Sequence, residues 1–188
     1  MKDERRERIL DGLIQNRSQL LRVLQSQDDL QFSMSALTWL LEEWDPDKEY
    51  TELELRKLRC FEASMVISFM RPFTKSRNGT TLSKKSIGIK LNENDKLLFQ
   101  KVDSVRNDFI AHSDEEKMDF RIRAFELDDP KNLFVPKTFY EYSLHFNYEE
   151  LRSLESLSGS LLTAVISTVW DLSQRHPKQM EFIKKPNR

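Results

Sequence analysis

The chain has 188 residues, of which 38% are hydrophobic, enough to bury the core of one domain spanning residues 1–188. Its formal net charge is −1, which excludes an overall positive field for gathering nucleic acid, so any such attraction requires a local patch. The single cysteine, Cys60, excludes a disulfide framework and is expected to be a small core residue. No apolar run reaches the roughly 20 residues of a membrane span, and the charged N-terminus lacks a signal-peptide pattern. We therefore expect a cytoplasmic protein with no membrane partner.

The first part of the chain predicts three helices. Apolar residues at helical spacing predict a first helix over 4–25 and a second over 28–44, where an Asp-Pro pair stops it. Thr51 and Glu54 form a capping-box pattern that opens a third helix, and this strongly apolar helix continues to Met70.

Residues 71–92 are predicted to form a basic loop, because an Asn-Gly pair and many Ser and Thr residues favour irregular structure. From Ala63 to Asn92 there is no acidic residue, although the whole chain carries 31. Two interpretations of this positive charge stay open, a surface that binds a phosphate backbone and a solvated loop. The RNA-binding candidates are Lys75, Arg77, Lys84, Lys85 and Lys90.

A fourth helix is predicted from about Asn92 to Ala111, followed by a β-hairpin within residues 117–146. Apolar residues occupy every second position in "KMDFRIRAFEL" and in "FYEYSLHFNY", and "DDPKN" between them supplies turn residues. In this pattern His145 is a surface residue of the second strand.

Asn147 and Glu150 are predicted to cap a long final helix, whose apolar residues run from Leu151 to Trp170. The expected fold class is therefore mainly α, a helical bundle of about five helices with one inserted β-hairpin.

The stretch "RNDFIAH", residues 106–112, carries the candidate chemistry. Histidine exchanges protons near neutral pH, and arginine presents a rigid fork of donors to phosphate. Arg106 and His112, with Asn107 as a hydrogen-bonding partner, are suited to metal-independent cleavage of RNA by its own 2′-hydroxyl. On a straight helix, however, Arg106 and His112 are separated by about 9 Å of rise, so a surface cation and a helix C-cap are the alternative interpretation.

Other chemistries have no pattern in the sequence. The three histidines and one cysteine show no metal-ligand spacing, and there is no glycine-rich phosphate loop. We therefore expect no metal and no cofactor.

The "RNDFIAH" stretch resembles the signature of the HEPN superfamily (higher eukaryotes and prokaryotes nucleotide-binding), whose members are helical bundles with an Arg, a polar residue and a His near the end of a helix. The resemblance implies a metal-independent endoribonuclease of anti-phage (abortive-infection) or toxin–antitoxin function, with Arg106, Asn107 and His112 as catalytic residues. It also implies RNA as substrate, a homodimer with the motif at its interface, and an antitoxin or other protein partner. Members paired with nucleotidyltransferases carry a tyrosine where this chain has Asp114, so regulation through that tyrosine is not implied.

A second class of function stays open, a non-catalytic helical module for protein–protein interaction or regulation. The two classes differ in what they require of His112. A ribonuclease needs this side chain exposed beside positive charge, whereas an interaction module tolerates it buried or paired.

Overall fold

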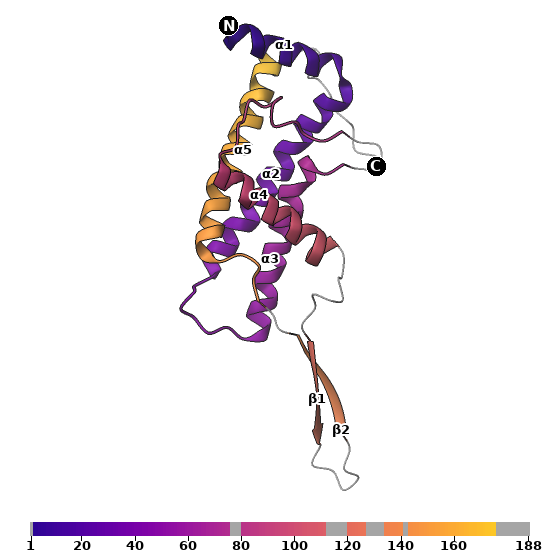
Figure 1. Cartoon of the computed structure of the whole chain (residues 1–188), viewed down its shortest axis with the longest axis vertical. Coiled ribbons are helices and arrows are strands. Elements are labelled where there is room, and N and C mark those ends of the chain that lie inside the picture. Colours follow the sequence, from indigo (N-terminus) through magenta and orange to yellow (C-terminus); the bar gives the residue numbers. More distant parts are fainter. Residues whose placement is uncertain (1, 76–79, 112–119, 127–133, 141–142, 176–188) are drawn as a thin grey trace, which may run out of the picture.

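The computed structural model describes residues 2–75, 80–111, 120–126, 134–140 and 143–175. It is a mainly helical bundle, with two short strands projecting from one end (Figure 1). Among the described residues, no helix has the length and apolar character to cross a bilayer. The elements in chain order are α1 (Lys2–Gln15), α2 (Arg17–Glu43), α3 (Glu52–Met70), η1 (Arg71–Phe73), α4 (Glu93–Val105), η2 (Arg106–Ala111), β1 (Phe120–Glu126), β2 (Phe134–Tyr140) and α5 (Tyr148–Arg175).

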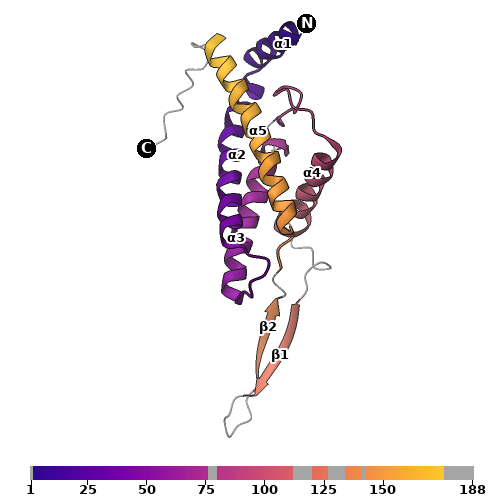
Figure 2. The same ribbon diagram turned by 90° about the vertical axis from the view of Figure 1, so that its left-hand side faces the viewer.

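The core lies where α2, α3 and α5 pack together. α2 contacts both α3 and α5, and Figure 2 shows α5 between α2 on one side and α4 on the other. Each long helix buries apolar residues at helical spacing, which removes one stripe per helix from water. Fully buried members of this core include Leu30, Leu37, Leu40, Met65, Phe69, Val102, Leu154 and Leu161.

The break between α1 and α2 is set by Asn16. Its backbone is extended, and its side-chain oxygen accepts a hydrogen bond from the Gln19 N–H at 3.2 Å. An asparagine in this N-cap position satisfies a donor that the helix itself leaves unpaired. The predicted boundary between helices over 4–25 and 28–44 is therefore wrong, because α2 continues through it without interruption.

Both predicted capping boxes are confirmed. Thr51 N–H donates to Glu54 Oε2 at 2.8 Å, and Glu54 N–H donates back to the Thr51 hydroxyl at 3.3 Å. Asn147 and Glu150 exchange the equivalent pair of bonds, each 2.9 Å long, at the start of α5. These polar residues start α3 and α5 at the positions that the sequence predicts.

Cys60, which is predicted to be a small core residue, is exposed, and so is the apolar Trp170. Cys60 lies at the surface of α3, and Trp170 on α5 is 64% exposed. Each is two residues away from a buried neighbour, Leu58 and Leu172 respectively, and two residues turn a helix by about 200°. Apolar residues therefore cover more of the circumference of these helices than the face that the bundle buries.

The described part of the predicted basic loop is packed onto the bundle. Leu82 and Ile87 are almost completely buried, and the Leu82 N–H donates to Pro72 O at 2.7 Å. Arg22 of α2 donates from Nε to Thr80 O at 2.6 Å. Gly88 has φ 74°, a conformation that residues with a Cβ rarely adopt. Buried apolar residues therefore anchor the segment 80–92 to the bundle, while Lys85 and Lys90 stay exposed, and both interpretations of its charge stay open.

β1 and β2 pair antiparallel, from Phe120 opposite Tyr140 to Glu126 opposite Phe134. The predicted range of 117–146 is too wide, and residues 127–133 between the strands lie outside the described residues. Leu144, His145 and Phe146, which the alternation places in the second strand, lie beyond β2. Their segment instead enters the bundle, where Phe146 is 1% exposed and backbone N–H groups bond to a side chain of α3.

Candidate functional site

The candidate motif lies where the helical hydrogen-bonding pattern changes. α4 begins with a capping box of Asn92 and Asp95 and is α-helical up to Val105, but η2 is a π-helical turn. A π turn bonds residue i to i+5 rather than i+4, and such turns occur frequently at functional sites. The helix predicted to about Ala111 therefore continues to that residue, but as a π turn rather than an α-helix after Val105.

The structure brings two of the three candidate catalytic residues into contact. Arg106 and Asn107 are both half-buried, and Arg106 Nη1 donates to Asn107 Oδ1 at 2.6 Å. The backbone N–H of Arg106 also donates to carbonyl oxygens of the preceding turn, which anchors the residue at the start of η2. His112 lies outside the described residues.

Asp103 joins this pair and is a residue that the sequence interpretation missed. Asn107 Nδ2 donates to Asp103 Oδ1 at 3.4 Å, so the three side chains form one hydrogen-bonded series. The available signal was the four-residue spacing between Asp103 and Asn107, which places both on one face of a helix.

The predicted RNA-binding residues do not share one environment. Lys75, Lys85 and Lys90 are exposed, whereas Arg77 lies outside the described residues. Lys84 is half-buried, with its ammonium 3.5 Å from the centre of the Phe99 ring. Burial lowers the pKa of Lys84. Lys84 is therefore a packed cation on an aromatic face, an arrangement that contributes to stability.

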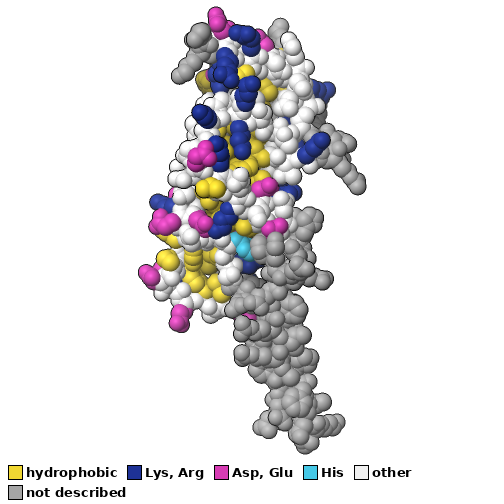
Figure 3. All heavy atoms as spheres, in the orientation of Figure 1, with side chains coloured by type: hydrophobic (Ala, Val, Ile, Leu, Met, Phe, Trp, Pro, Cys, Tyr) yellow, Lys and Arg dark blue, Asp and Glu magenta, His cyan; other side chains and the backbone are white. Residues whose placement is uncertain are grey.

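The packed basic segment contacts the helix that leads into the motif. Phe99, which Lys84 covers, is seven residues before Arg106 on α4, two turns or about 10 Å along the axis. Figure 3 shows Lys and Arg side chains mostly on the upper part of the visible face, toward α1.

A second cluster of ionisable groups lies where the chain returns from β2 to α5. Glu62 of α3 is 1% exposed, and its Oε1 accepts from the backbone N–H of His145 at 2.7 Å and of Phe146 at 3.2 Å. Burial raises the pKa of Glu62 to about 7, against the opposing effect of these N–H groups and of Arg59. Burial, together with the charges of Arg59 and Lys101, lowers the pKa of His145 to about 4.

This cluster connects three helices to the segment after β2. Arg59 Nη1 donates to Ser143 O at 2.8 Å, and Lys101 of α4 pairs with Glu150 of α5 at 2.6 Å. The predicted role of His145 as a strand surface residue is therefore wrong. An acid within the apolar run "LRCFEASMV" was the sequence signal for Glu62. Because Glu62 is closed off from solvent, its position suits an anchor rather than a group that meets substrate.

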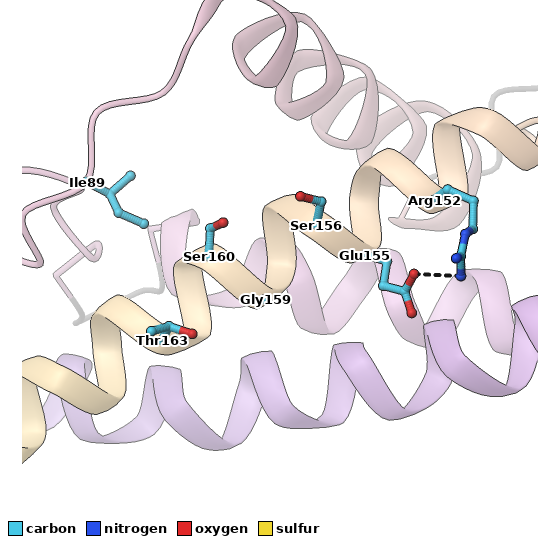
Figure 4. Close-up of a pocket in the computed structure, with 7 residues that line it drawn as sticks. All are labelled: Ile89, Arg152, Glu155, Ser156, Gly159, Ser160 and Thr163. Carbon is cyan, nitrogen blue, oxygen red and sulfur yellow. Dashed lines mark hydrogen bonds and ion pairs between the residues drawn. The ribbon is translucent and has the colours of Figure 1, made fainter.

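A groove along α5 offers little for chemistry (Figure 4). Its two charged side chains, Arg152 and Glu155, form an ion pair at 2.8 Å. The other lining residues are small or aliphatic: Ile89, Ser156, Gly159, Ser160 and Thr163.

Within the described part of the chain, no group of three His, Cys, Asp or Glu side chains is placed to hold a metal ion. Comparisons with protein families, with curated proteins and with solved structures find no match to this chain. The functional argument therefore rests on the geometry around Arg106 and on the motif itself.

Proposed function

We propose that this protein is a metal-independent endoribonuclease of the HEPN type, acting in anti-phage defence or as the toxin of a toxin–antitoxin pair in the cytoplasm. The observation that carries the proposal is the contact between Arg106 and Asn107 in a π-helical turn. This contact holds a guanidinium, the group best suited to grip a phosphodiester, in one orientation at the end of a helix. The remaining member of the motif, His112, supplies proton transfer.

The proposed reaction uses the 2′-hydroxyl of the RNA as its nucleophile and needs two proton-transfer groups. The 2′-hydroxyl oxygen attacks the adjacent phosphorus while the bond from phosphorus to the 5′ oxygen breaks, which leaves a 2′,3′-cyclic phosphate and a 5′-hydroxyl end. A base takes the proton of the attacking oxygen, and an acid gives a proton to the leaving oxygen. Arg106 stabilises the negative charge that grows on the phosphate oxygens, and His112 serves as one of the two proton-transfer groups.

The exposed lysines of the segment 71–92 are proposed to hold the RNA backbone. Lys75, Lys85 and Lys90 are free to meet phosphates because their side chains are exposed, whereas Lys84 is engaged with Phe99. Arg77 belongs to the same proposed surface by its place in the sequence. Their contribution is affinity rather than bond cleavage.

Cleavage of RNA in EDTA by purified protein tests the proposal. We expect 2′,3′-cyclic phosphate ends by mass spectrometry. His112→Ala should lower the rate about 100-fold or more through loss of proton transfer, and Arg106→Ala by a similar factor through loss of charge stabilisation.

Two variants serve as matched controls. Arg152→Ala removes an arginine that is paired with Glu155 on a different helix, α5, and His176→Ala removes another histidine. Both should cleave at the wild-type rate. If Arg106→Ala and His112→Ala also cleave at that rate, the catalytic assignment is wrong.

A non-catalytic interaction module is the second candidate, and exposed aromatic side chains on α2 favour it. Phe32 is 59% exposed and Trp39 53% exposed, and their seven-residue spacing places them on one face. Exposed apolar patches mark sites of protein–protein contact. If this function is correct, wild-type protein leaves RNA intact in EDTA, and Phe32→Ser with Trp39→Ser abolishes the biological effect that His112→Ala preserves.

A further inference from the structure

Three side chains at the junction of α4 and η2 form a hydrogen-bonded series. Arg106 Nη1 donates to Asn107 Oδ1 at 2.6 Å, and Asn107 Nδ2 donates to Asp103 Oδ1 at 3.4 Å. All three side chains are half-buried. The amide of Asn107 therefore has its oxygen toward a cation and its nitrogen toward a carboxylate.

The carboxylate determines which way the amide of Asn107 faces. An asparagine side chain has an acceptor at one end and two donors at the other, and either end fits the same space. A carboxylate only accepts, so Asp103 favours the orientation that presents the amide nitrogen to it. In that orientation the oxygen of Asn107 is the end that meets Arg106. Without Asp103 only the guanidinium, which itself only donates, selects the oxygen end of the amide, so Asn107 and its bond to Arg106 are held less firmly.

The place of Asp103 is otherwise unfavourable. It lies in the last turn of α4, and η2 continues the helical backbone to Ala111, so Asp103 is far from the helix N-terminus, where the dipole would favour an acid. It also puts a negative charge beside the guanidinium that is to hold a phosphate, which weakens attraction of that phosphate. Neither helix stability nor RNA affinity accounts for an acid here, whereas the orientation of Asn107 does.

We propose that Asp103 is a positioning residue that fixes Arg106 through the amide of Asn107 in the geometry needed for the transition state. This inference rests on the proposed ribonuclease function. Asp103 itself touches neither substrate nor the reacting atoms. It keeps the Arg106 guanidinium in one position before RNA binds. The entropy of ordering this side chain therefore does not add to the activation free energy.

Asp108 provides a matched control in the same turn. It accepts a hydrogen bond from the Ser104 hydroxyl at 2.8 Å. Replacing Asp108 with Ala removes a carboxylate from the same end of the helix. The comparison separates loss of a nearby negative charge from loss of the contact with Asn107.

Cleavage kinetics of Asp103→Ala, Asp103→Asn and Asp108→Ala test the proposal. We expect Asp103→Ala to lower kcat about tenfold or more while KM stays constant or falls, because a repelling charge is gone. Asp103→Asn can present either end of its amide to Asn107 and should restore only part of kcat, and Asp108→Ala should lower kcat less than Asp103→Ala does. A wild-type kcat for Asp103→Ala, or equal losses for Asp103→Ala and Asp108→Ala, would overturn the proposal.

Nuclear magnetic resonance distinguishes failure of this inference from failure of the ribonuclease function. The side-chain amide of Asn107, assigned through its loss in Asn107→Ala, should have two well-separated proton shifts in the wild type. They should converge in Asp103→Ala but not in Asp108→Ala. If wild-type protein cleaves no RNA but this convergence occurs, the function is wrong and the positioning contact is correct. Unchanged Asn107 shifts in Asp103→Ala would overturn the positioning role whatever the activity.

Discussion

Glu62 and His145 are neighbouring groups whose pKa values are shifted in opposite directions by the same burial. The pKa of Glu62 rises to about 7 and that of His145 falls to about 4, so both side chains favour their uncharged forms. Arg59 and Lys101 are the cations that face them, and Glu150 is held by Lys101. The segment after β2 is thus anchored to α3 by groups whose charge depends on pH.

The two shifts predict opposing effects on stability. Glu62 binds its proton more tightly in the folded state than at its ordinary pKa of 4.5, so its stabilising effect is complete below pH 4.5 and is lost as pH rises through about 7. The folded state holds His145 in its neutral form, so its effect is present above pH 6.5 and is lost as pH falls toward about 4. Between these limits the two trends offset each other.

We predict that in Glu62→Gln the pH dependence of the free energy of unfolding reflects His145 alone. The amide oxygen still accepts the two backbone N–H groups but does not ionise, so the free energy of unfolding should rise from about pH 4 to 6.5 and then stay constant. At pH 8 the variant avoids a cost of about 3 kcal/mol that follows from the shift in the pKa of Glu62. Urea unfolding between pH 4 and 8 measures this. Glu155→Gln, at an exposed ion pair, should follow the wild-type curve, and a wild-type curve for Glu62→Gln would contradict the prediction.

At the scale of the element, the segment 80–92 shows why a run of basic residues in the sequence does not by itself define a phosphate-binding surface. Leu82 and Ile87 insert into the core and fix the path of the backbone. That path directs Lys84 onto the rings of Phe99 and Phe73 and leaves Lys85 exposed. Two adjacent lysines of equal interest in the sequence therefore have different environments.

We predict that replacing Lys84 affects stability, whereas replacing Lys85 affects RNA binding. Lys84→Ala should lower the free energy of unfolding by about 1 kcal/mol, because it removes a half-buried cation from an aromatic face. Lys85→Ala should leave stability within about 0.5 kcal/mol and reduce the salt dependence of RNA binding by about 0.7 in log–log slope, the value for one phosphate contact on a single strand. Urea unfolding and binding titrations at several salt concentrations measure the two effects. An unchanged salt slope in Lys85→Ala would exclude this lysine from the RNA surface.

At the scale of the whole molecule, a single chain offers one histidine in its motif, whereas in-line cleavage uses both a base and an acid. A two-fold dimer with the motif helices facing each other would bring a second His112 and a second Arg106 to the opposite side of the phosphate. Val102 and Val105 are buried in the core, so the contact has to use the edges of α4 and η2 rather than that stripe.

We predict a homodimer at micromolar concentration, measured by light scattering coupled to size exclusion. Mixing Arg106→Ala with His112→Ala protein should restore part of the cleavage activity if each copy completes the site of the other. Arg152→Ala mixed with His112→Ala is the control for dilution of the inactive copy. A strictly monomeric protein with full activity would contradict the dimer.

The sequence by itself determined the features that depend on near neighbours in the chain. The capping boxes of Thr51 with Glu54 and of Asn147 with Glu150 start α3 and α5 as predicted, because a cap needs only residues three apart. Helical periodicity likewise predicted a mainly helical bundle. The Arg106 and Asn107 pair was found because the two are adjacent.

Tertiary structure decided what depends on residues far apart in the chain. Glu62 lies 83 residues from His145, and it accepts the backbone N–H of this residue, which the alternation of apolar residues had assigned to the second strand. The core buried one stripe of each helix, which left Cys60 and Trp170 outside although their stretches are apolar. Lys84 packs against the Phe99 ring of α4 and so is not part of the exposed surface that the sequence predicts to bind RNA. In each case the free energy of burial and pairing between elements outweighed the local pattern, and no local pattern encodes which elements meet.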